Sequence, residues 1–453
     1  MKKTIALFLC FLLAVSLAAP AFADNVAFAL PCRVEGGFSG SIRTYHDSYE
    51  GNYYLSVIDT SALLNGSAKQ FRYYKGYTQE DGTYYTIQTG QSAAQAGGAD
   101  SAFASAAVSY LTFSRNKLYV DGQERKYYTH NPGNGDLYMS LADLQLMLDI
   151  RAELEESGTL VFYPGEGYHP DLDALIADGF FDQMSAVFLG DADTGEVLYY
   201  NNSRTPLPIA STSKLMTYLI IREAIDAGEI KESSWVTFSQ KAIDLSQSAD
   251  GIVKLHKGMG APVSELIDAM MIASSNESAL ALAEAICGSE EAFVERMNKK
   301  AKELFLSTAK FYTCHGLPSY SESTFAVKRQ SMMSAAQLFE LTQTVLEKYP
   351  ELTQTTARQY LKLENLDYTT ANSNPLLFNM PGVNGLKTGN TNRAGFCVVV
   401  SMPVTKGEET HTIVLVLLGA ETPALRGQAA EILLRYARDY YAENGFLGAE
   451  KAA

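Results

Sequence analysis

The tetrapeptide Ser211-Thr212-Ser213-Lys214 places a nucleophile and a potential base three residues apart. It leads into a long apolar segment, 212–227, whose pattern predicts a helix. Positions i and i+3 share a helix face, so the Lys214 amine can reach the Ser211 hydroxyl. A buried lysine at the positive end of a helix tends to lose its proton, which suits a general base. Taken alone, however, the motif favours a helix-capping serine with a surface lysine.

A second polar group, Ser274-Ser275-Asn276, separates two apolar helical stretches at 263–272 and 278–286. In a catalytic interpretation, Ser274 relays a proton to a departing amine, and the Asn276 amide holds the backbone of a peptide substrate. As an isolated motif, the tripeptide is better explained by Asn276 capping the second helix. The motif by itself does not choose between these roles.

A third group, Lys387-Thr388-Gly389, opens a predicted edge strand near the C-terminus. Glycine would let an extended substrate lie close against this strand. The lysine and threonine would supply a positive charge and a hydroxyl for a terminal carboxylate. The alternative is a strand that simply starts with an exposed lysine. This motif therefore indicates a function only together with the other two motifs.

The three motifs are far more specific together, because they occur in a fixed order and each lies in the secondary structure that its role requires. A lone SxxK pattern is common by accident; one lies at 114–117, beside a predicted strand and without a KTG partner. The complete set resembles the D-alanyl-D-alanine carboxypeptidase family, the low-molecular-mass penicillin-binding proteins, over about 185–441. The neighbourhoods that extend this match are 208–217, 273–279, 315–318 and 382–389.

This resemblance implies acyl transfer in two steps, in which Ser211 is acylated, Lys214 accepts its proton and backbone N–H groups hold the oxyanion. The residues it assigns to catalysis are Ser211, Lys214, Ser274 and Asn276, and those it assigns to substrate binding are Lys387, Thr388, Gly389 and Arg426. The implied partners are peptidoglycan stem peptides, with β-lactam antibiotics as covalent inhibitors. No metal or other cofactor is required.

The sequence departs from the family pattern in three places. Asn390 follows the KTG motif, where the family often has histidine. The segment 319–330 lacks the usual pattern of the nearby substrate wall. The chain also ends soon after its closing helix, where many relatives continue into a β-rich domain and a membrane-binding helix, so membrane attachment is not expected.

Two other functions use the same residues. A serine β-lactamase adds a glutamate that activates water for deacylation, and the nearest approach to its motif is Glu303-Leu304-Phe305-Leu306-Ser307, with serine in place of asparagine. A catalytically inactive wall-binding protein would keep the fold only to hold peptide. The motif evidence favours the carboxypeptidase over the lactamase, and the complete motif set argues against the inactive protein.

The elements around these motifs predict an α+β catalytic domain at 185–446, of the β-lactamase/D,D-peptidase-like type implied by the resemblance. Apolar alternation predicts one hairpin at about 185–200 and a second at 395–418, followed by a closing helix at 424–444. Strands at both ends with a helical block between them predict a single antiparallel sheet assembled from the two ends of the domain.

The preceding segment, 24–163, contains a weak repeat in which a short strand turns into a helix capped near a serine, once at 52–64 and once at 136–148. We therefore predict a small α/β repeat domain, with His130 in a solvent-facing loop. It loosely resembles the repeat at the N-terminus of copper amine oxidases and in wall-associated proteins of Gram-positive bacteria, which implies a wall-binding or spacer role. Gly and Pro residues predict a linker at 164–184.

The bulk composition limits the partners and the compartment. The 453-residue chain carries a formal net charge of -15, which argues against nucleic acid and anionic lipid as partners. Residues 1–23 read as a cleavable signal peptide, because two lysines precede a short apolar run and an Ala-Phe-Ala site. We therefore expect an exported protein, extracellular or associated with the cell wall, with no membrane-spanning segment in its mature form. The remaining four cysteines show no metal-binding spacing, and the sequence does not decide whether two of them form a disulfide.

Overall fold

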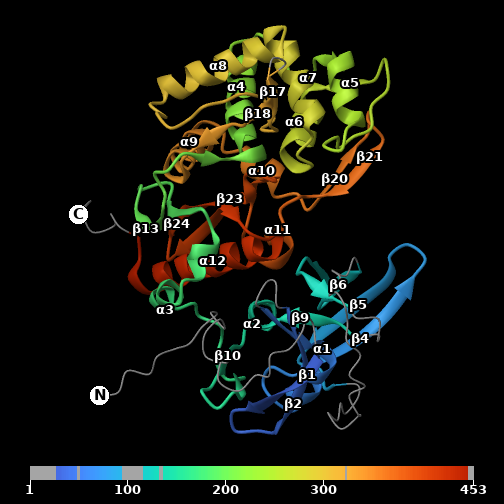
Figure 1. Ribbon diagram of the computed structural model, residues 1–453, viewed down its shortest axis with the longest axis vertical. Coiled ribbons are helices and arrows are strands. Elements are labelled where there is room, and N and C mark those ends of the chain that lie inside the picture. Colours follow the sequence, from blue (N-terminus) through green and yellow to red (C-terminus); the bar gives the residue numbers. More distant parts are fainter. Residues whose placement is uncertain (1–26, 48–51, 94–115, 132–135, 322–323, 447–453) are drawn as a thin grey trace. The chain divides into compact units, whose positions relative to one another are not determined.

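The computed structural model describes residues 27–47, 52–93, 116–131, 136–321 and 324–446 (Figure 1). The predicted signal peptide, 1–23, lies outside these ranges. Internal contacts divide the chain into two compact units, Met1–Phe180 and Phe181–Ala453.

The first unit contains two sheets. The larger sheet has the strand order β10-β11-β1-β2-β3-β9-β8, and the smaller one has the order β4-β5-β6-β7. The strands of the larger sheet are β1 Ala27–Val34, β2 Ser39–Asp47, β3 Asn52–Ser56, β8 Thr129–His130, β9 Tyr138–Ser140, β10 Arg151–Leu154 and β11 Leu160–Tyr163. Those of the smaller sheet are β4 Phe71–Thr78, β5 Gly82–Thr89, β6 Lys117–Val120 and β7 Gln123–Arg125.

Both copies of the predicted strand-to-helix repeat form. Strand β3 runs into helix α1 (Val57–Leu63) and strand β9 runs into α2 (Leu141–Leu148). In each copy the serine at the junction accepts a hydrogen bond from the backbone N–H three residues later, at 3.1 Å, which satisfies a free donor of the helix start. The two strands pair antiparallel, so the copies share one sheet.

Two local expectations for this unit differ from the structure. His130 is 1% exposed and its ring lies 4.1 Å from that of Tyr54, so it is a core residue and not a solvent-facing one. The segment expected to be a linker contains helix α3 (Leu172–Ala177), because Asp171 caps it and Leu172 and Leu175 are buried. Its six residues are too few to show a helical period beside the Gly and Pro residues at 164–170.

The second unit is built on one five-stranded sheet with the order β13-β12-β24-β23-β22, and every pairing in it is antiparallel. Strands β12 (Ala186–Asp191) and β13 (Val197–Asn201) come from the start of the unit. Strands β22 (Gly385–Thr391), β23 (Gly395–Lys406) and β24 (Glu409–Ala420) come from its end. The predicted hairpins and the predicted assembly of the sheet from both ends are confirmed.

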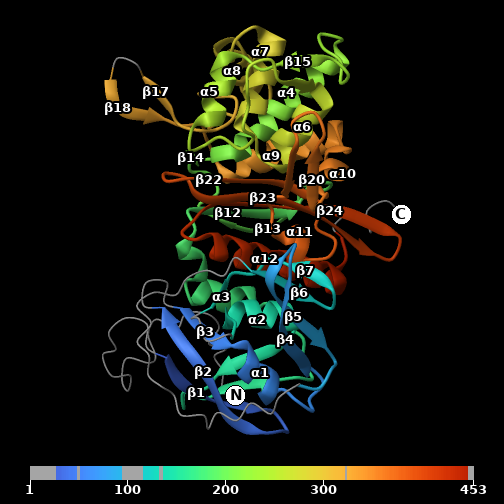
Figure 2. The ribbon, with the colours of Figure 1, turned by 90° about the vertical axis from the view of Figure 1, so that its right-hand side faces the viewer.

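Helices cover both faces of this sheet (Figure 2). The long closing helix α12 (Pro423–Asn444) packs on one face, against β23 and β24, while α9 (Ala335–Lys348) lies on the other face with the helical block above it. The helices and single turns of the block are η2 Ala210–Ser213, α4 Lys214–Asp226, α5 Gln240–Gln247, α6 Val263–Ile272, α7 Asn276–Cys287 and α8 Glu290–Glu303. Helix α4 is buried on nearly every side, as expected of a helix that is apolar all round.

The described part of the chain has no helix with the length and hydrophobicity that a bilayer crossing needs. The four cysteines Cys32, Cys287, Cys314 and Cys397 are all free thiols. These four residues therefore form no disulfide.

Candidate active site

Ser211 lies in the single turn η2, directly before helix α4, and not inside the helix as the i, i+3 argument assumed. Ala210 has a φ of 45°, a left-handed conformation that is uncommon outside glycine and that occurs often at functional sites. Lys214 is the first residue of α4 and is fully buried. The expected contact nevertheless forms, because the Lys214 Nζ is 2.9 Å from the Ser211 Oγ.

The Lys214 amine has two further partners, both of which are carbonyl oxygens. Its Nζ donates to the Asn276 Oδ1 at 2.8 Å and to the main-chain oxygen of His315 at 2.7 Å. A carbonyl oxygen can only accept, and a neutral amine has two hydrogens and one lone pair. When the amine is neutral, the two carbonyls take both hydrogens, so the lone pair is left for the Ser211 hydroxyl. This arrangement is what a general base needs.

Burial lowers the pKa of the Lys214 amine to about 7, and nearby Cys314 and Glu277 oppose this shift. The Glu277 carboxylate is itself buried and accepts hydrogen bonds from the backbone N–H groups of Ile252 and Val253. A base whose pKa lies near neutral pH is deprotonated often enough to accept a proton and still returns it readily.

The Ser274–Asn276 segment enters the same site, and the capping role considered for Asn276 belongs to its neighbour. Ser275, and not Asn276, caps helix α7, since its Oγ accepts from the Ser278 N–H at 3.0 Å. The Asn276 amide is used inside the protein, with its oxygen on Lys214 and its Nδ2 donating to the Asp250 oxygen at 2.8 Å. Ser274 has a φ of 64°, and its hydroxyl accepts from the Lys387 Nζ at 2.8 Å.

Strand β22, which holds Lys387, Thr388 and Gly389, is the edge strand that the sequence predicted. Lys387 is 1% exposed, so the alternative of a strand that simply starts with an exposed lysine is excluded. Burial, with the charges of Lys214 and Arg426, lowers its pKa well below the ordinary value. Its Nζ donates to the Thr388 oxygen at 2.9 Å as well as to Ser274. Thr388 shares a hydrogen bond of 2.7 Å with Ser373, a residue that the sequence did not single out.

Gly389 has a packing role that the sequence did not predict. A Cβ at this position would lie 2.8 Å from the Ser211 backbone nitrogen and 3.1 Å from that of Thr212. The missing side chain therefore lets η2 pack against β22, which brings the nucleophile beside the strand. Backbone N–H groups at this contact, among them that of Ser211, are candidates for the expected oxyanion site.

Arg426 lies in the first turn of α12 and is 7% exposed. It is close enough to Lys387 and to Cys397 for its charge to lower both their pKa values. Hydrogen bonds or backbone contacts thus join the predicted site residues Ser211, Lys214, Ser274, Asn276 and 387–389. Arg426 lies near Lys387.

His315 is the functional group that sequence reasoning missed, because the group is its main-chain carbonyl. This oxygen accepts from Lys214, and the Ser211 Oγ lies 3.5 Å from it. A signal was present at the next residue. Gly316 has a φ of 88°, and a Cβ there would lie 2.1 Å from the Ala210 oxygen. Only glycine permits the turn at 313–317 to pack this closely against the nucleophile.

The structure also locates the departing segment 319–330 and the glutamate considered for the lactamase alternative. The segment 319–330 forms a hairpin, β17 (Ser319–Ser321) with β18 (Thr324–Arg329), and Gln330 donates to the Thr391 hydroxyl at 2.6 Å. Glu303, the nearest approach to a lactamase glutamate, is the last residue of α8 and pairs with Lys300 at 3.0 Å. Its side chain is half-exposed, so it does not serve as a base inside the site.

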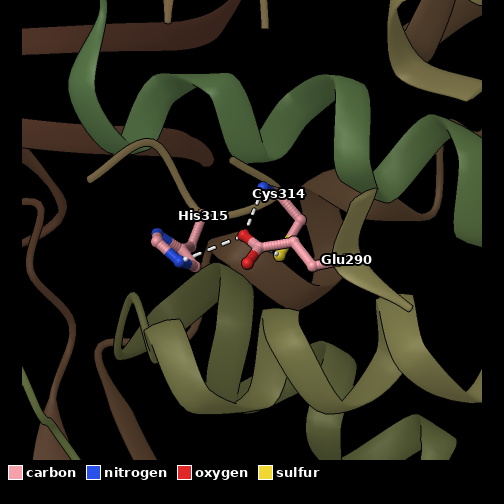
Figure 3. A group of neighbouring side chains, drawn as sticks. All are labelled: Glu290, Cys314 and His315. Carbon is pink, nitrogen blue, oxygen red and sulfur yellow. Dashed lines mark hydrogen bonds and ion pairs between the residues drawn. The ribbon is translucent and has the colours of Figure 1, made fainter. Parts of the chain in front are cut away.

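Among the described residues, two groups hold metal-binding atoms close together: Glu290, Cys314 and His315 (Figure 3), and Asp191, Asp193 and His411. In the second group, Asp191 Oδ2 is 2.6 Å from His411 Nδ1, and Asp193 accepts from the Thr412 N–H. In the first group, Glu290 accepts from the Cys314 N–H at 3.1 Å. Both groups are thus engaged in hydrogen bonds within the protein.

A sheet edge, a nucleophile turn and a polar loop meet in this site, and together with the fold they define a framework of the β-lactamase/D,D-peptidase-like class. A comparison with protein families agrees: the model of the D-alanyl-D-alanine carboxypeptidase family matches residues 182–422, which is more than half of the chain. The chain belongs to this family, and its second unit has the β-lactamase/D,D-peptidase-like fold.

Similar proteins include D-alanyl-D-alanine carboxypeptidase DacF of Bacillus subtilis, 37% identical over 264 residues, which span 57% of this chain and 63% of that protein. DacC of Escherichia coli is 30% identical over 256 residues, with 55% and 60% of the two chains covered. The chain therefore spans about 60% of the length of these relatives. Among solved structures, PBP3 of Streptococcus pneumoniae, described as a peptidoglycan synthesis regulatory factor, has a TM-score of 0.52 and 29% identity, with 56% of this chain and 73% of that chain covered.

Proposed function

We propose that this protein is a serine D-Ala-D-Ala carboxypeptidase that removes the terminal D-alanine from peptidoglycan stem peptides. The observation that carries the proposal is the Lys214 amine, whose two hydrogens are taken by carbonyl oxygens and whose third partner is the Ser211 hydroxyl, at 2.9 Å. A serine alcohol is a weak nucleophile unless a neighbouring base accepts its proton. The family match and the names of the relatives support the same reaction.

In the first step, the Ser211 Oγ forms a bond to the carbonyl carbon of the penultimate D-alanine, and its proton passes to the Lys214 lone pair. The tetrahedral oxyanion is stabilised by backbone N–H groups at the contact of η2 with β22. The C–N bond then breaks as the departing amine takes the proton that Lys214 had accepted, so the Lys214 amine is neutral again. We propose that Ser274 relays that proton, and the hydrogen bond between its hydroxyl and the Lys387 amine supports this role.

In the second step, water attacks the ester carbon of the acyl-enzyme. Lys214 accepts a proton from that water, and the Ser211 oxygen leaves with a proton, which restores the free enzyme. The products are free D-alanine and a peptide shortened by one residue. The step uses only residues of this chain and water.

The substrate carboxylate would be bound by Thr388, Lys387 and Arg426. In the free protein, burial and two neighbouring positive charges keep the pKa of Lys387 low. A carboxylate that arrives beside it supplies the missing counter-charge, so substrate binding should be accompanied by proton uptake. This feature favours a substrate that ends in a carboxylate, as stem peptides do.

The same chemistry accounts for the expected inhibitors and location. A β-lactam carries a strained amide and a carboxylate, so it would acylate Ser211 in place of the peptide. Peptidoglycan lies outside the cytoplasm, and the signal-like segment 1–23 supports export to it. The α/β repeat unit would then serve as a wall-binding or spacer module.

A test measures D-alanine released from a synthetic peptide that ends in D-Ala-D-Ala, for the wild type and for Ser211→Ala. We expect release by the wild type and none above background by the variant. Peptide mapping after exposure to a penicillin should locate the adduct on Ser211, with a lifetime of hours. A lifetime of seconds would instead assign a β-lactamase, and a folded wild type without release or adduct would assign a non-catalytic binding protein.

A further inference from the structure

The turn at 313–317 is anchored by a buried carboxylate that the proposed mechanism does not use. Glu290 is the first residue of helix α8 and is 8% exposed. Its Oε1 accepts from the Cys314 backbone N–H at 3.1 Å and lies 3.3 Å from the His315 Nε2 (Figure 3). Its Oε2 accepts from the Lys241 Nζ at 2.8 Å. One carboxylate thus holds two successive residues of the turn.

The protonation of His315 follows from its other ring nitrogen. Its Nδ1 accepts from the Leu317 N–H at 3.2 Å, so in the neutral ring the hydrogen is on Nε2 and faces Glu290. Burial lowers the pKa of His315 to about 4, which leaves the ring neutral at physiological pH. Because the nitrogen that faces Glu290 carries the hydrogen, this cluster is a hydrogen-bonded anchor and not a set of metal ligands.

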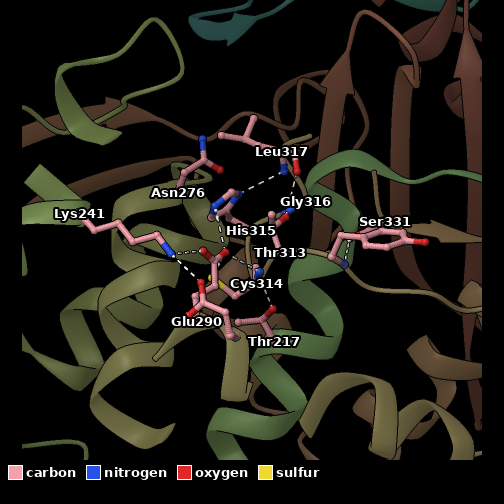
Figure 4. A network of polar contacts seen from close by, with 12 residues as sticks. Thr217, Lys241, Asn276, Glu290, Thr313, Cys314, His315, Gly316, Leu317 and Ser331 are labelled. Atoms are coloured by element: carbon pink, nitrogen blue, oxygen red, sulfur yellow. Dashed lines mark hydrogen bonds and ion pairs between the residues drawn. The ribbon is translucent and has the colours of Figure 1, made fainter. Parts of the chain in front are cut away.

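The anchored turn is joined to the catalytic helix from a second side (Figure 4). Thr217, which lies three residues after Lys214 on α4, donates to the Cys314 oxygen at 2.5 Å. Inside the turn, Thr313 accepts from the Gly316 N–H at 3.0 Å. The peptide units on both sides of Cys314 are therefore fixed, and so is the direction in which the next carbonyl, that of His315, points.

We propose that Glu290 is a positioning residue for the acyl-transfer reaction. By fixing the Cys314 N–H and the His315 ring, it keeps the His315 carbonyl on one hydrogen of the Lys214 amine. With the second hydrogen on Asn276, the lone pair can only face Ser211. This role rests on the proposed function, because it acts through the base of that reaction.

Loss of this anchor has two consequences for Lys214. If the His315 carbonyl moves away, the amine can rotate about its Cε–Nζ bond, and the lone pair faces Ser211 for less of the time. The protonated amine also loses a charge-assisted hydrogen bond, which is stronger than the bond of the neutral amine, so the pKa of Lys214 should fall. The other titratable groups that face Lys214 are Glu277 on α7, Cys314 in the turn and Lys387 on β22. Of these three, Cys314 is the one that contacts Glu290, and burial raises the pKa of its thiol well above the ordinary value, which keeps it neutral.

The test compares Glu290→Gln with the matched variant Glu291→Gln. Glu291 lies at the same helix start and contacts the same Lys241, at 3.4 Å, but its side chain is 77% exposed and forms no hydrogen bond or ion pair with the described residues of the turn. The measurement is the second-order rate constant of acylation by a penicillin from about pH 5 to pH 9. For Glu290→Gln we expect a fall of roughly tenfold and an acid limb at lower pH than in the wild type. Glu291→Gln should keep the wild-type profile within about twofold.

A purely structural role would reduce the fraction of active protein without moving the acid limb. The proposal is overturned if folded Glu290→Gln has the rate and acid limb of the wild type, or if Glu291→Gln shows the same changes. Should Glu290→Gln not fold, His315→Gln removes the ring contact and keeps the carbonyl, and a wild-type profile for it overturns the proposal equally. A wild type that is not acylated at all would refute the proposed function instead, so the two failures are distinct.

Discussion

Replacing Asn276 by aspartate should shift the working pH range of the enzyme upward. The substitution keeps the shape of the side chain but puts a negative charge on the atom that lies 2.8 Å from the Lys214 Nζ. At that separation of 2.8 Å, an effective dielectric constant of about 20 gives an attraction of roughly 6 kcal/mol before desolvation. If about half of it survives the burial of the new charge, ~3 kcal/mol remain to stabilise the ammonium form.

One pKa unit corresponds to about 1.4 kcal/mol, so the pKa of Lys214 should rise by about two units, to roughly 9. In the wild type, with a pKa of about 7, half of the lysine is neutral at pH 7. In the variant only about 1% would be neutral, which predicts a fall in the acylation rate of about 50-fold at that pH. Because the base is restored by deprotonation, most of the rate should return near pH 9 to 10.

The assay is the pH dependence of penicillin acylation, followed by stopped-flow or rapid quench. Asn444→Asp is a suitable control, since it adds the same charge at the exposed end of α12, and it should behave as the wild type. A folded Asn276→Asp protein whose acid limb stays near pH 7 would refute the assignment of Lys214 as the base. A rate that stays low at alkaline pH would show that the variant fails for a reason other than protonation.

Two further substitutions test the packing. Gly389→Ala should reduce the acylation rate by at least about tenfold while the protein stays folded, because the new Cβ would lie 2.8 Å from the Ser211 nitrogen and displace the nucleophile. Gly427→Ala is the control and should keep the wild-type rate, because no atom lies within 4 Å of the Cβ position there. Equal rates for the two variants would contradict this packing. In the first unit, Ser56→Ala should lower the free energy of unfolding by roughly 2 kcal/mol, since it removes a helix cap and a hydrogen bond of 2.5 Å to buried Asp136. Chemical denaturation measures this loss, and a change below about 0.5 kcal/mol would show that the cap contributes little.

The elements of the catalytic unit could be predicted because their signals are local and strong. In the two hairpins, apolar and polar residues alternate on either side of a clear turn. Helix α6 begins and ends at the residues expected, 263 and 272. Elements without a period of their own were not foreseen. The two-residue strands β14 (Leu207–Pro208) and β19 (Met332–Met333) pair across more than a hundred residues. Such pairs depend on tertiary packing, which cannot be predicted from a short stretch of sequence.

The side chains of the site could be predicted from their types and spacing, but the reasons for their positions could not. The missing Cβ of Gly389 makes room for the Ser211 backbone, a packing role that the sequence did not indicate. The partners of Asn276, which are Lys214 and the Asp250 oxygen, lie 62 and 26 residues away along the chain. The carbonyl of His315 has no signature of its own, since every residue carries one, and only the glycine that follows it marks the turn. Contacts of this kind follow only from the folded backbone.

The most direct measurement is the pKa of Lys214 itself. Protein labelled with ¹³C at the lysine Cε would be titrated by NMR, and the signal of Lys214 assigned by its loss in Lys214→Arg, with Lys387→Arg identifying the second buried lysine. A midpoint of about 7 is predicted for Lys214, and it would leave a neutral amine to accept the Ser211 proton. A midpoint near the ordinary lysine value of about 10.4 would mean a permanent cation at this position, and the proposed base would be wrong.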